Sequence, residues 1–404
     1  MTLLGDAKVV LAVSGGIAAY KAADLASKLT QAGATVETIL SQSAQEFVRP
    51  LTFSALTRRP VHADPFEAWT EAAAGHITLG HDADVLLVAP ATANTIARLA
   101  LGLADDLLGM VSLATSAPLT IAPAMEHQMY MHPATQAHIA TLKSRGATIV
   151  GPDSGRLASG EIGTGRFAPT EDILGALRIV LGRNGVLAGE RVVVTAGGTH
   201  EPLDPVRFLG NRSSGKMGYA LAQAALDRGA SVTLISGPTN LRPPYGATLV
   251  NIETARDMEA AVQAAVLDAT MLVMSAAVSD FRPRNQFGSK LKKEKVGGEL
   301  TIELDRNPDI VAGVSTKGIF KIGFAAETDD LLANAADKLR GKGLAMIVAN
   351  DAVTTIGSDD STAILLFADG SQEQLPALTK EEVAGIILDR AAVLGGSRGR
   401  QVIP

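Results

Sequence analysis

The stretch RFLGNRSSGKMGY, residues 207–219, concentrates hydrogen-bond donors and positive charge in one short segment. It follows an apolar run and a glycine turn, RVVVTAGGT at 191–199, and precedes a segment rich in alanine and leucine. A strand, a glycine loop and a helix in this order direct backbone N–H groups and the positive end of a helix toward one place, where a phosphate can bind. The TAGGT turn alone is equally compatible with an ordinary Rossmann turn, because such turns are common. The combined string is more specific and predicts a site for a phosphorylated ligand.

A second group of charged residues lies further along this half of the chain. The segment SAAVSDFRP at 275–283 follows an apolar run and contains Asp280, and Lys290, Lys292 and Lys293 follow within KLKKEK. When a nucleotide triphosphate activates a carboxylate, lysines and a divalent metal ion stabilise the charge that builds on the phosphates. Each lysine taken singly is better explained as a solubilising surface residue, so the prediction depends on the set.

Three loops in the first half combine small residues with hydroxyl groups. SGGIAAYK at 14–21 opens a predicted helix, and APATAN at 89–94 and APAM at 122–125 lie at the ends of predicted strands. Ligands of α/β sheets bind at the carboxyl ends of the strands, where small residues let a flat ring approach the backbone. His76, in AGHITL, is a candidate general base, although a lone histidine is more often structural.

Alternating apolar strands and amphipathic helices must position these groups. In the first half we expect strands at 8–13, 35–40, 85–89, 119–123 and 148–150, and helices at 17–32 and 134–145. In the second half we expect strands at 191–195, 231–235, 248–252, 271–274, 319–324 and 344–348, helices at 218–228, 254–267, 329–340 and 380–392, and a terminal hairpin of 363–366 with 372–375. This order predicts right-handed crossovers and two doubly wound, Rossmann-like α/β domains.

Two segments interrupt the alternation. Glycines and an asparagine break the pattern at 181–190, so we expect one domain over 1–183 and another over 190–404. The segment 281–298 is rich in Lys, Arg, Gly and Pro and is too polar to predict a regular element. It fits either a solvated surface loop or a mobile lid over an anionic ligand.

Composition narrows the class of protein. The 404 residues exceed what one core usually serves, and 47% hydrophobic with only 4% aromatic residues is typical of parallel sheets covered by Ala-rich helices. A formal charge of −6 argues against nucleic-acid binding. Because no apolar run reaches the roughly 20 residues of a membrane helix and the first residues lack signal-peptide features, we expect a soluble cytoplasmic protein with neither nucleic-acid nor membrane partners. The chain has no cysteine, which excludes disulfides, thiolate metal sites and cysteine nucleophiles.

Residues 190–395 resemble phosphopantothenate–cysteine ligases, chiefly through the NRSSGKMGY string. The resemblance implies CTP as cosubstrate, Mg²⁺ or Mn²⁺, and an acyl-cytidylate intermediate. It implies that Lys290 serves activation, that Asn211 stabilises the intermediate, and that Asp280 lies near the ribose and the metal. The other substrate positions that it implies are Arg207, Ser213, Ser214, Gly215 and Lys216, and the other CTP positions are Met274, Ser275, Ala276, Pro308, Asp309, Ile310, Val311, Phe324, Lys338 and Lys342.

Residues 5–180 resemble flavin-containing cysteine decarboxylases, in particular phosphopantothenoylcysteine decarboxylase. SGGIAAYK, GHITL, APATANTIARLALGLADDLL and APAM occur in this order. The resemblance implies a flavodoxin-like fold that binds FMN, oxidation of the cysteinyl side chain to a thioaldehyde that loses CO₂, and His76 as the active-site base. The FMN positions that it implies are Ser14, Gly15, Gly16, Ala91, Thr92, Asn94, Thr95, Pro123, Ala124 and Met125, and the substrate positions are Glu126 and Met129. The two halves in this order match bifunctional bacterial coenzyme A biosynthesis proteins, which implies 4′-phosphopantothenate and cysteine as substrates.

Two positions depart from the decarboxylase pattern. Position 126 is glutamate where the family often has an asparagine that binds the substrate carboxylate, and an ionised Glu126 would repel that carboxylate by about 4 kcal/mol at roughly 4 Å. Glu126 is therefore protonated, turned away, or replaced in its role by His127. Ser159 stands in the flexible segment 155–166 where the family carries a protonating cysteine. Its hydroxyl is a much weaker acid than a thiol of pKa about 8.5, but it can still position water or substrate.

Three functions remain open at this point. The chain is the bifunctional enzyme, or a ligase whose first half only binds flavin or assembles subunits, or a nicotinamide oxidoreductase with tandem Rossmann domains. The third is disfavoured because neither glycine loop has GxGxxG spacing and no acidic residue is placed for a ribose. The family resemblance also implies a homo-oligomer, with trimers of the first domain and dimers of the second.

Overall fold

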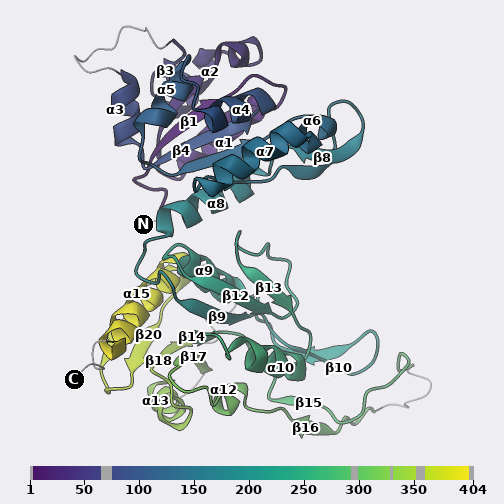
Figure 1. Cartoon of the computed structure of the whole chain (residues 1–404). Helices are drawn as coiled ribbons and strands as arrows, with labels where there is room; N and C mark the ends of the chain where they lie inside the picture. Colours follow the sequence, from purple (N-terminus) through teal and green to yellow (C-terminus); the bar gives the residue numbers. More distant parts are fainter. Residues whose placement is uncertain (1–2, 65–74, 293–298, 328–330, 352–359, 400–404) are drawn as a thin grey trace. The chain divides into compact units, whose positions relative to one another are not determined.

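A computed structural model describes residues 3–64, 75–292, 299–327, 331–351 and 360–399. The chain divides into two compact units, Met1–Gly182 and Arg183–Pro404 (Figure 1). Each unit is built on a parallel sheet with helices on both faces, which confirms the predicted α/β class. Among the helices of the described residues, none is both long and apolar enough to cross a bilayer.

The first unit has a six-stranded parallel sheet in the order β3-β2-β1-β4-β5-β6. Its strands are β1 (Lys8–Val13), β2 (Thr35–Leu40), β3 (Val61–His62), β4 (Val85–Ala91), β5 (Leu119–Pro123) and β6 (Thr148–Ile149). Without the two-residue edge strand β3, the order β2-β1-β4-β5-β6 is the flavodoxin-like one. The chain changes direction across the sheet between β1 and β4, so the crevice at their carboxyl ends is the expected ligand position.

Helices cover both faces of this sheet. They are α1 (Ala19–Gln31), the 3₁₀ helix η1 (Gln42–Glu46), α2 (Pro50–Thr57), α3 (Gly75–Asp82), α4 (Ala93–Leu101), α5 (Leu107–Ala114), α6 (His127–Met131), α7 (Pro133–Ser144) and α8 (Thr170–Gly182). Because side chains alternate along a strand, Val10 and Ala12 face one side of the sheet, where they pack with Ile96 of α4 and Ile139 of α7. Helices α1 and α8 contact each other and also contact strand β4.

The second unit has an eight-stranded sheet in the order β13-β12-β9-β14-β17-β18-β20-β21. Its strands are β9 (Arg191–Ala196), β12 (Ser231–Ser236), β13 (Thr248–Asn251), β14 (Met271–Met274), β17 (Phe320–Glu327), β18 (Met346–Asp351), β20 (Ile364–Phe367) and β21 (Gln372–Gln374). The first six are parallel and follow the Rossmann order, and β20 and β21 form the predicted antiparallel terminal hairpin. The switch point of this sheet lies between β9 and β14.

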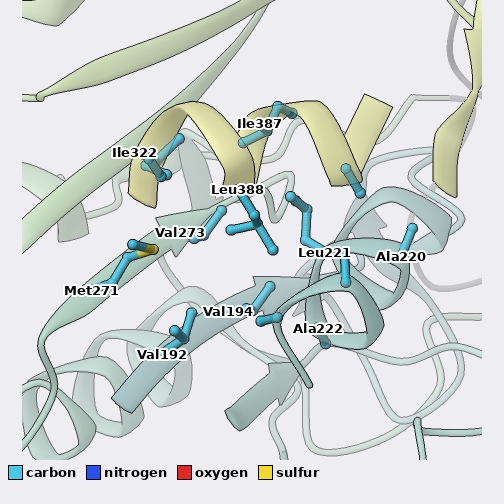
Figure 2. Close-up of a cluster of buried hydrophobic side chains, with 14 of the residues drawn as sticks. Val192, Val194, Ala220, Leu221, Ala222, Met271, Val273, Ile322, Ile387 and Leu388 are labelled. Carbon is cyan, nitrogen blue, oxygen red and sulfur yellow. The ribbon is translucent and has the colours of Figure 1, made fainter. Parts of the chain in front are cut away.

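The helices of the second unit are α9 (Lys216–Leu226), α10 (Ala255–Ala265), α12 (Ile310–Gly313), α13 (Leu331–Gly341) and α15 (Lys380–Gly399). Figure 2 shows Val192 and Val194 of β9 packing toward Leu221 of α9 and Leu388 of α15. Val193, between them in the strand, faces the opposite side and packs with α10. Alternation along one buried strand therefore supplies both faces with core residues, as in other sheets covered on both sides.

Two segments that the sequence predicts as loops form paired strands. Residues 281–298 begin with β15 (Phe281–Pro283), which pairs antiparallel with β16 (Leu304–Arg306), so the expectation of no regular element is wrong there. Arg284 next to β15 forms ion pairs of 2.9 Å with Glu303 and Asp305, which join the charged residues that follow β15 to the opposite strand. Likewise 155–166 lies mostly within a hairpin of β7 (Asp153–Arg156) with β8 (Ile162–Arg166). Lys293 lies outside the described residues.

Two further short strand pairings of the described residues belong to the second unit. Strand β10 (His200–Pro202) pairs with β11 (Phe208–Gly210), so the donor-rich stretch 207–219 is partly a strand rather than a loop. Strand β19 (Asp360–Ser361) pairs with β22 (Leu378–Thr379). The β10–β11 ribbon contacts β15, so the two ribbons form one polar extension of the second unit.

Candidate active sites of the two units

Ser14 joins the two strands at the switch point of the first unit. Its buried hydroxyl donates to the Pro90 carbonyl at 2.7 Å and accepts from the Thr92 amide at 3.0 Å. This serine, expected at the FMN site, thus fixes the loop after β1 against the loop after β4. Within the described part of the chain, the amides of Gly15 and Gly16 donate no hydrogen bond. Two free amides before a helix are what an anionic group can use.

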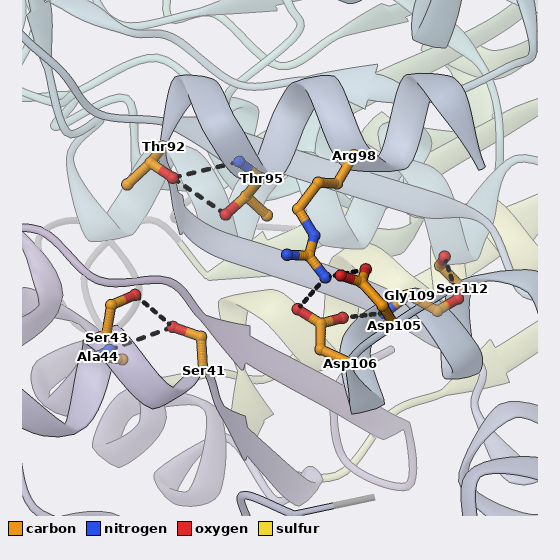
Figure 3. Close-up of polar contacts among 10 residues, drawn as sticks. All are labelled: Ser41, Ser43, Ala44, Thr92, Thr95, Arg98, Asp105, Asp106, Gly109 and Ser112. Atoms are coloured by element: carbon orange, nitrogen blue, oxygen red, sulfur yellow. Dashed lines mark hydrogen bonds and ion pairs between the residues drawn. The ribbon is translucent and has the colours of Figure 1, made fainter. Parts of the chain in front are cut away.

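A third loop, after β2, meets these two. A Cβ atom at Gly15 would collide with Ser43, so only glycine permits this approach. Ser41 accepts from the Ala44 amide at 3.1 Å and its hydroxyl lies 3.2 Å from that of Ser43 (Figure 3). The sequence analysis missed both serines, although a serine pair directly after an apolar strand was the available signal.

The start of α4 adds a hydroxyl cluster. Thr92 caps the helix by accepting from the Thr95 amide at 3.3 Å, and the two hydroxyls are 3.0 Å apart (Figure 3). Asn94, on the first turn, is exposed. Arg98, one turn further on, is paired with Asp105 and with Asp106, the latter at 3.2 Å. Arg98 is thus engaged by two carboxylates, and the hydroxyl groups of Thr92 and Thr95 lie on the first turn of α4.

The loop after β5 completes the edge. The Ala124 amide donates to Ala91 at 3.0 Å, and the Met125 amide donates to Gly165 of β8 at 3.0 Å. The structure therefore brings together the predicted FMN positions of three loops and adds the β7–β8 hairpin to them.

Glu126 and His127 are both used in local structure. One Glu126 oxygen caps α6, accepting from the Gln128 amide at 2.6 Å, and the other is buried without a partner among the described residues. His127 Nδ1 lies 3.1 Å from the Thr164 amide nitrogen and 3.2 Å from the Thr164 carbonyl oxygen, and the ring packs against Gly163 of the hairpin. Of the three alternatives for Glu126, this geometry favours a carboxylate turned toward its own helix.

The remaining predicted residues of the first unit lie on the hairpin turn, on α6 and on α3. Ser159 is exposed in the turn of the β7–β8 hairpin, and Met129 is half-exposed on α6. His76 lies on the first turn of α3, and in the described ranges no hydrogen bond or ion pair joins it to the three loops.

Thr195 and Ser275 join the switch-point strands of the second unit. The Ser275 hydroxyl donates to the Thr195 carbonyl at 2.6 Å, and the Thr195 hydroxyl accepts from the Ala276 amide at 3.2 Å. Beyond them, the Ala277 amide donates to Gly197 at 2.8 Å. Here backbone and hydroxyl groups together perform the role that Ser14 has in the first unit.

The Asn211–Lys216 loop lies on this edge. Asn211 donates its side-chain amide to the Ala277 carbonyl at 2.9 Å. Gly215 has a φ of +78° at the N-terminal cap of α9, a conformation that favours glycine. In the part of the chain that the structure describes, the amides of Ser213 and Ser214 donate to no protein acceptor. The loop therefore offers free amides and a helix start to a phosphate.

A neighbouring segment carries the predicted nucleotide contacts. The Asn307 amide donates to the Asp280 carbonyl at 2.8 Å, so the backbone at residue 280 lies beside that of residue 307, and the Asp280 side chain is exposed. Asp309 caps α12 and forms a 3.0 Å ion pair with Lys342. Partial burial raises the pKa of Asp309, but the Ala312 amide and Lys342 outweigh burial, so the net pKa is lowered.

The other predicted CTP positions occupy several elements. Met274 ends β14, Phe324 lies within β17, and Lys338 is on α13. Among the described residues, no group of three His, Asp or Glu side chains is arranged to hold a metal. Asp280 would thus bind a divalent ion only together with ligand oxygens, a mode that suits Mg²⁺ with a nucleotide.

Arg207 contacts the residue that follows Lys290 in the chain. Lys290 is exposed, while Arg207 donates to the Leu291 carbonyl at 3.1 Å and pairs with Asp204. The structure therefore places Arg207, a predicted substrate ligand, in contact with the segment that carries the predicted activating lysine.

Both units match known protein families. The family model described as "Flavoprotein" matches residues 2–181, and that of the "DNA/pantothenate metabolism flavoprotein C-terminal domain" matches residues 187–394. The chain is 43% identical over 394 residues to the coenzyme A biosynthesis bifunctional protein CoaBC of Vibrio cholerae, covering 96% of this chain and 98% of the relative. It is also 43% identical over 407 residues to the CoaBC protein of Bacillus subtilis, covering 99% and 100%.

A crystal structure of the C-terminal domain of a CoaBC protein is 40% identical and covers 52% of this chain and 97% of that one, with a TM-score of 0.45. The family models and the near full-length relatives establish the family without it. This chain belongs to the family of coenzyme A biosynthesis bifunctional proteins, with a flavoprotein unit followed by a pantothenate-metabolism unit.

Proposed function

We propose that this chain catalyses two consecutive steps of coenzyme A biosynthesis. The second unit joins 4′-phosphopantothenate to cysteine at the expense of CTP, and the first unit decarboxylates the product to 4′-phosphopantetheine. The observation that carries the proposal is the presence, at each switch point, of a loop with unpaired backbone amides, in a chain related over its whole length to bifunctional proteins.

Ligation proceeds in two steps at the second switch point. A carboxylate oxygen of 4′-phosphopantothenate attacks the α-phosphorus of CTP, pyrophosphate leaves, and an acyl-cytidylate forms. The cysteine amine then attacks the acyl carbon and CMP leaves. Ser213, Ser214 and Gly215 with Lys216 bind phosphate, Lys290 stabilises the charge of the first step, and Asn211 holds the intermediate.

The nucleotide and its metal ion use the neighbouring segment. Asp280 binds Mg²⁺ or Mn²⁺ together with phosphate oxygens, because a single carboxylate plus phosphates suits these ions. Met274, Ser275 and Ala276 and the segment 308–311 line the base and ribose, with Phe324, Lys338 and Lys342 as further contacts.

The first unit fits a flavin mononucleotide. The glycine loop could not accept a Cβ at Gly15, and it presents two free amides beside the hydroxyls of Ser43 and Thr92. These neutral donors suit one terminal phosphate, and the loops 91–95 and 123–125 form the walls for a flat ring. FMN supplies oxidation of the cysteinyl side chain, which permits loss of CO₂, and then returns the electrons.

The chain's own residues bind 4′-phosphopantothenoylcysteine and remove its proton. His76 removes a proton as general base. Ser159 positions water or substrate from the hairpin turn, and Met129 contacts the substrate near α6. Glu126 supports the substrate loop by capping α6, so its charge is directed toward amides rather than toward the substrate carboxylate.

A second candidate function keeps the ligase but restricts the first unit to flavin binding and subunit assembly. Serine at position 159 and glutamate at position 126 favour it, because neither residue reproduces the chemistry of cysteine or asparagine. For either function we propose a cytoplasmic homo-oligomer, built from trimers of the first unit and dimers of the second.

One assay separates these functions. The purified protein is incubated with 4′-phosphopantothenate, cysteine, CTP and Mg²⁺, and the products are followed by mass. Pyrophosphate, CMP and 4′-phosphopantetheine support the two-step function. Accumulation of 4′-phosphopantothenoylcysteine, with a flavin spectrum but no CO₂, supports the second candidate, and absence of CTP turnover contradicts both.

A further inference from the structure

We propose that Asp204 is a positioning residue for ligation, which holds the backbone of the Lys290 segment against the turn between β10 and β11. This inference rests on the proposed function, because it assigns Asp204 an effect on the step that Lys290 serves. Asp204 and Arg207, which act on this segment together, are called the latch below.

The Asp204 carboxylate is buried and saturated with donors. Its side chain has 0% exposed surface, whereas that of Arg207 has 44%. Oδ1 accepts from the Val206 and Arg207 amides at 2.8 and 2.9 Å. Oδ2 accepts from Arg207 Nε at 3.0 Å and Nη2 at 2.5 Å.

The same latch forms hydrogen bonds with both backbone groups of residue 291. The Leu291 amide donates to Asp204 Oδ2 at 3.1 Å. Arg207 Nη2 donates to the Leu291 carbonyl at 3.1 Å. Two side chains thus take the place of the opposing backbone in a strand pair, and the residue that they hold is the immediate neighbour of Lys290.

Among the residues that the structure describes, few other contacts hold this segment in place. Residues 284–290 are all exposed, so little apolar burial orients them. The Phe287 amide donates to the Leu203 carbonyl at 3.0 Å, which is a second attachment to the same turn. Because Lys290 must reach a phosphate from an exposed segment, the orientation of its backbone depends on the turn at 203–207.

The latch is ionic and stays charged near neutrality. The Arg207 guanidinium, assisted by the amides of Val206, Leu291 and Arg207, outweighs desolvation and holds the pKa of Asp204 well below its usual range. A carboxylate of lowered pKa keeps its contribution above its ordinary pKa of about 3.9 and loses it only at more acid pH. Removing this charge leaves the Leu291 amide and the guanidinium without their shared acceptor.

The experiment uses full-length protein with Asp204→Asn, and Asp305→Asn as the matched control. Asp305 pairs with Arg284 at 2.9 Å in the neighbouring ribbon but is not among the atoms that hold residue 291. We expect Asp204→Asn to lower kcat for pyrophosphate release about 10- to 100-fold, with KM for CTP changed less, since small misplacements of a reacting group have effects of this size. Trypsin should cleave after Lys292 faster than in wild type, and Asp305→Asn should change neither readout.

A double variant distinguishes positioning from general damage. If Asp204 acts through Lys290, Asp204→Asn combined with Lys290→Gln is no slower than Lys290→Gln alone, whereas additive losses overturn the inference. Wild-type rates and wild-type cleavage in Asp204→Asn also overturn it. If Lys290→Gln keeps full turnover while Asp204→Asn is slow, the proposed role of Lys290 fails, and with it the inference that Asp204 acts through Lys290. Full turnover of Lys290→Gln, together with wild-type rates for Asp204→Asn, rejects both the role of Lys290 and the inference about Asp204.

A second pair of variants tests the latch if Asp204→Asn does not fold. Leu291→Pro removes the amide donor to Asp204 and leaves the Asp204–Arg207 pair intact, and Leu291→Ala retains the amide. The proposal expects slow pyrophosphate release for the proline variant and a rate within about threefold of wild type for the alanine variant. Equal rates for the two variants contradict it.

Discussion

Each unit attaches a short antiparallel ribbon beside its switch point, but the two ribbons are held by different chemistry. In the first unit, the β7–β8 hairpin is docked by the Met125 amide and by His127 Nδ1, which lies within hydrogen-bond distance of the Thr164 backbone. In the second, the β10–β11 turn and the segment after β15 are joined by the buried Asp204–Arg207 pair.

The difference has a physical consequence. A hairpin held by neutral hydrogen bonds can leave its site and exchange each bond for water at a small net cost. A buried carboxylate cannot lose its guanidinium without a large penalty, because an uncompensated charge would remain. The first ribbon is therefore suited to opening during turnover, and the second to holding one geometry.

The largest effects are expected when each unit is inactivated separately. Changing His76 to Asn removes the proposed general base and should lower CO₂ release from 4′-phosphopantothenoylcysteine by about 10²- to 10⁴-fold. Pyrophosphate release in the ligase assay should remain at the wild-type rate. Retention of full CO₂ release would mean that His76 is not the base.

The converse substitution addresses the second unit. Lys290→Gln should slow formation of the acyl-cytidylate by about 10²- to 10³-fold, because the charge that builds on the phosphates loses a cation. Lys317→Gln, at an exposed lysine outside the predicted site, is the control and should stay within about threefold of wild type. Pyrophosphate release and CO₂ release are measured on the same preparations, and full ligase turnover in Lys290→Gln would exclude it as the activating lysine.

The ionic contact of the second ribbon should resist acid. The pKa of Asp204 is lowered, chiefly by the Arg207 guanidinium, so its carboxylate stays ionised down to pH 5. Between pH 8 and pH 5 we therefore expect proteolysis within residues 284–292 to stay constant. An acid-resistant protease with single-site mass readout measures the rate, and acceleration toward pH 5 would contradict the expectation.

Replacing the imidazole tests how the first ribbon is held. His127→Leu keeps an apolar side chain near Gly163 but removes the ring nitrogen that hydrogen-bonds to the Thr164 backbone, which should lower the free energy of unfolding by about 1 kcal/mol. The change should be smaller than that for Asp204→Asn under the same denaturant series. An equal or larger loss for His127→Leu would contradict the ranking.

The smallest expected effects concern the departures from the decarboxylase pattern. Ser159→Cys should raise CO₂ release only a few-fold, since it restores a stronger acid in the hairpin turn, and Ser144→Cys is the exposed control.

Glu126→Asn should change the free energy of unfolding by less than about 0.5 kcal/mol, because asparagine also caps helices. It should tighten substrate binding, and loss of activity with flavin still bound would make Glu126 a working catalytic group.

The sequence by itself determined the main elements of both sheets. Apolar runs predicted β1, β5 and β14 to the residue, because a buried parallel strand is hydrophobic throughout and is bounded by glycine, proline or polar residues. The glycine loops at 14–16 and 197–198 followed from the same local signals. These features depend on residues that are close together in the chain.

Only the tertiary structure decided the ribbons and the ties between loops. Phe281 pairs with Arg306, and three-residue strands at such separation have no periodicity to detect. The hydroxyl of Ser14 bonds to Pro90, and the carboxylate of Asp204 bonds to Leu291, which is 87 residues away. Local propensity cannot specify such contacts, because the folding of the whole sheet brings their partners together.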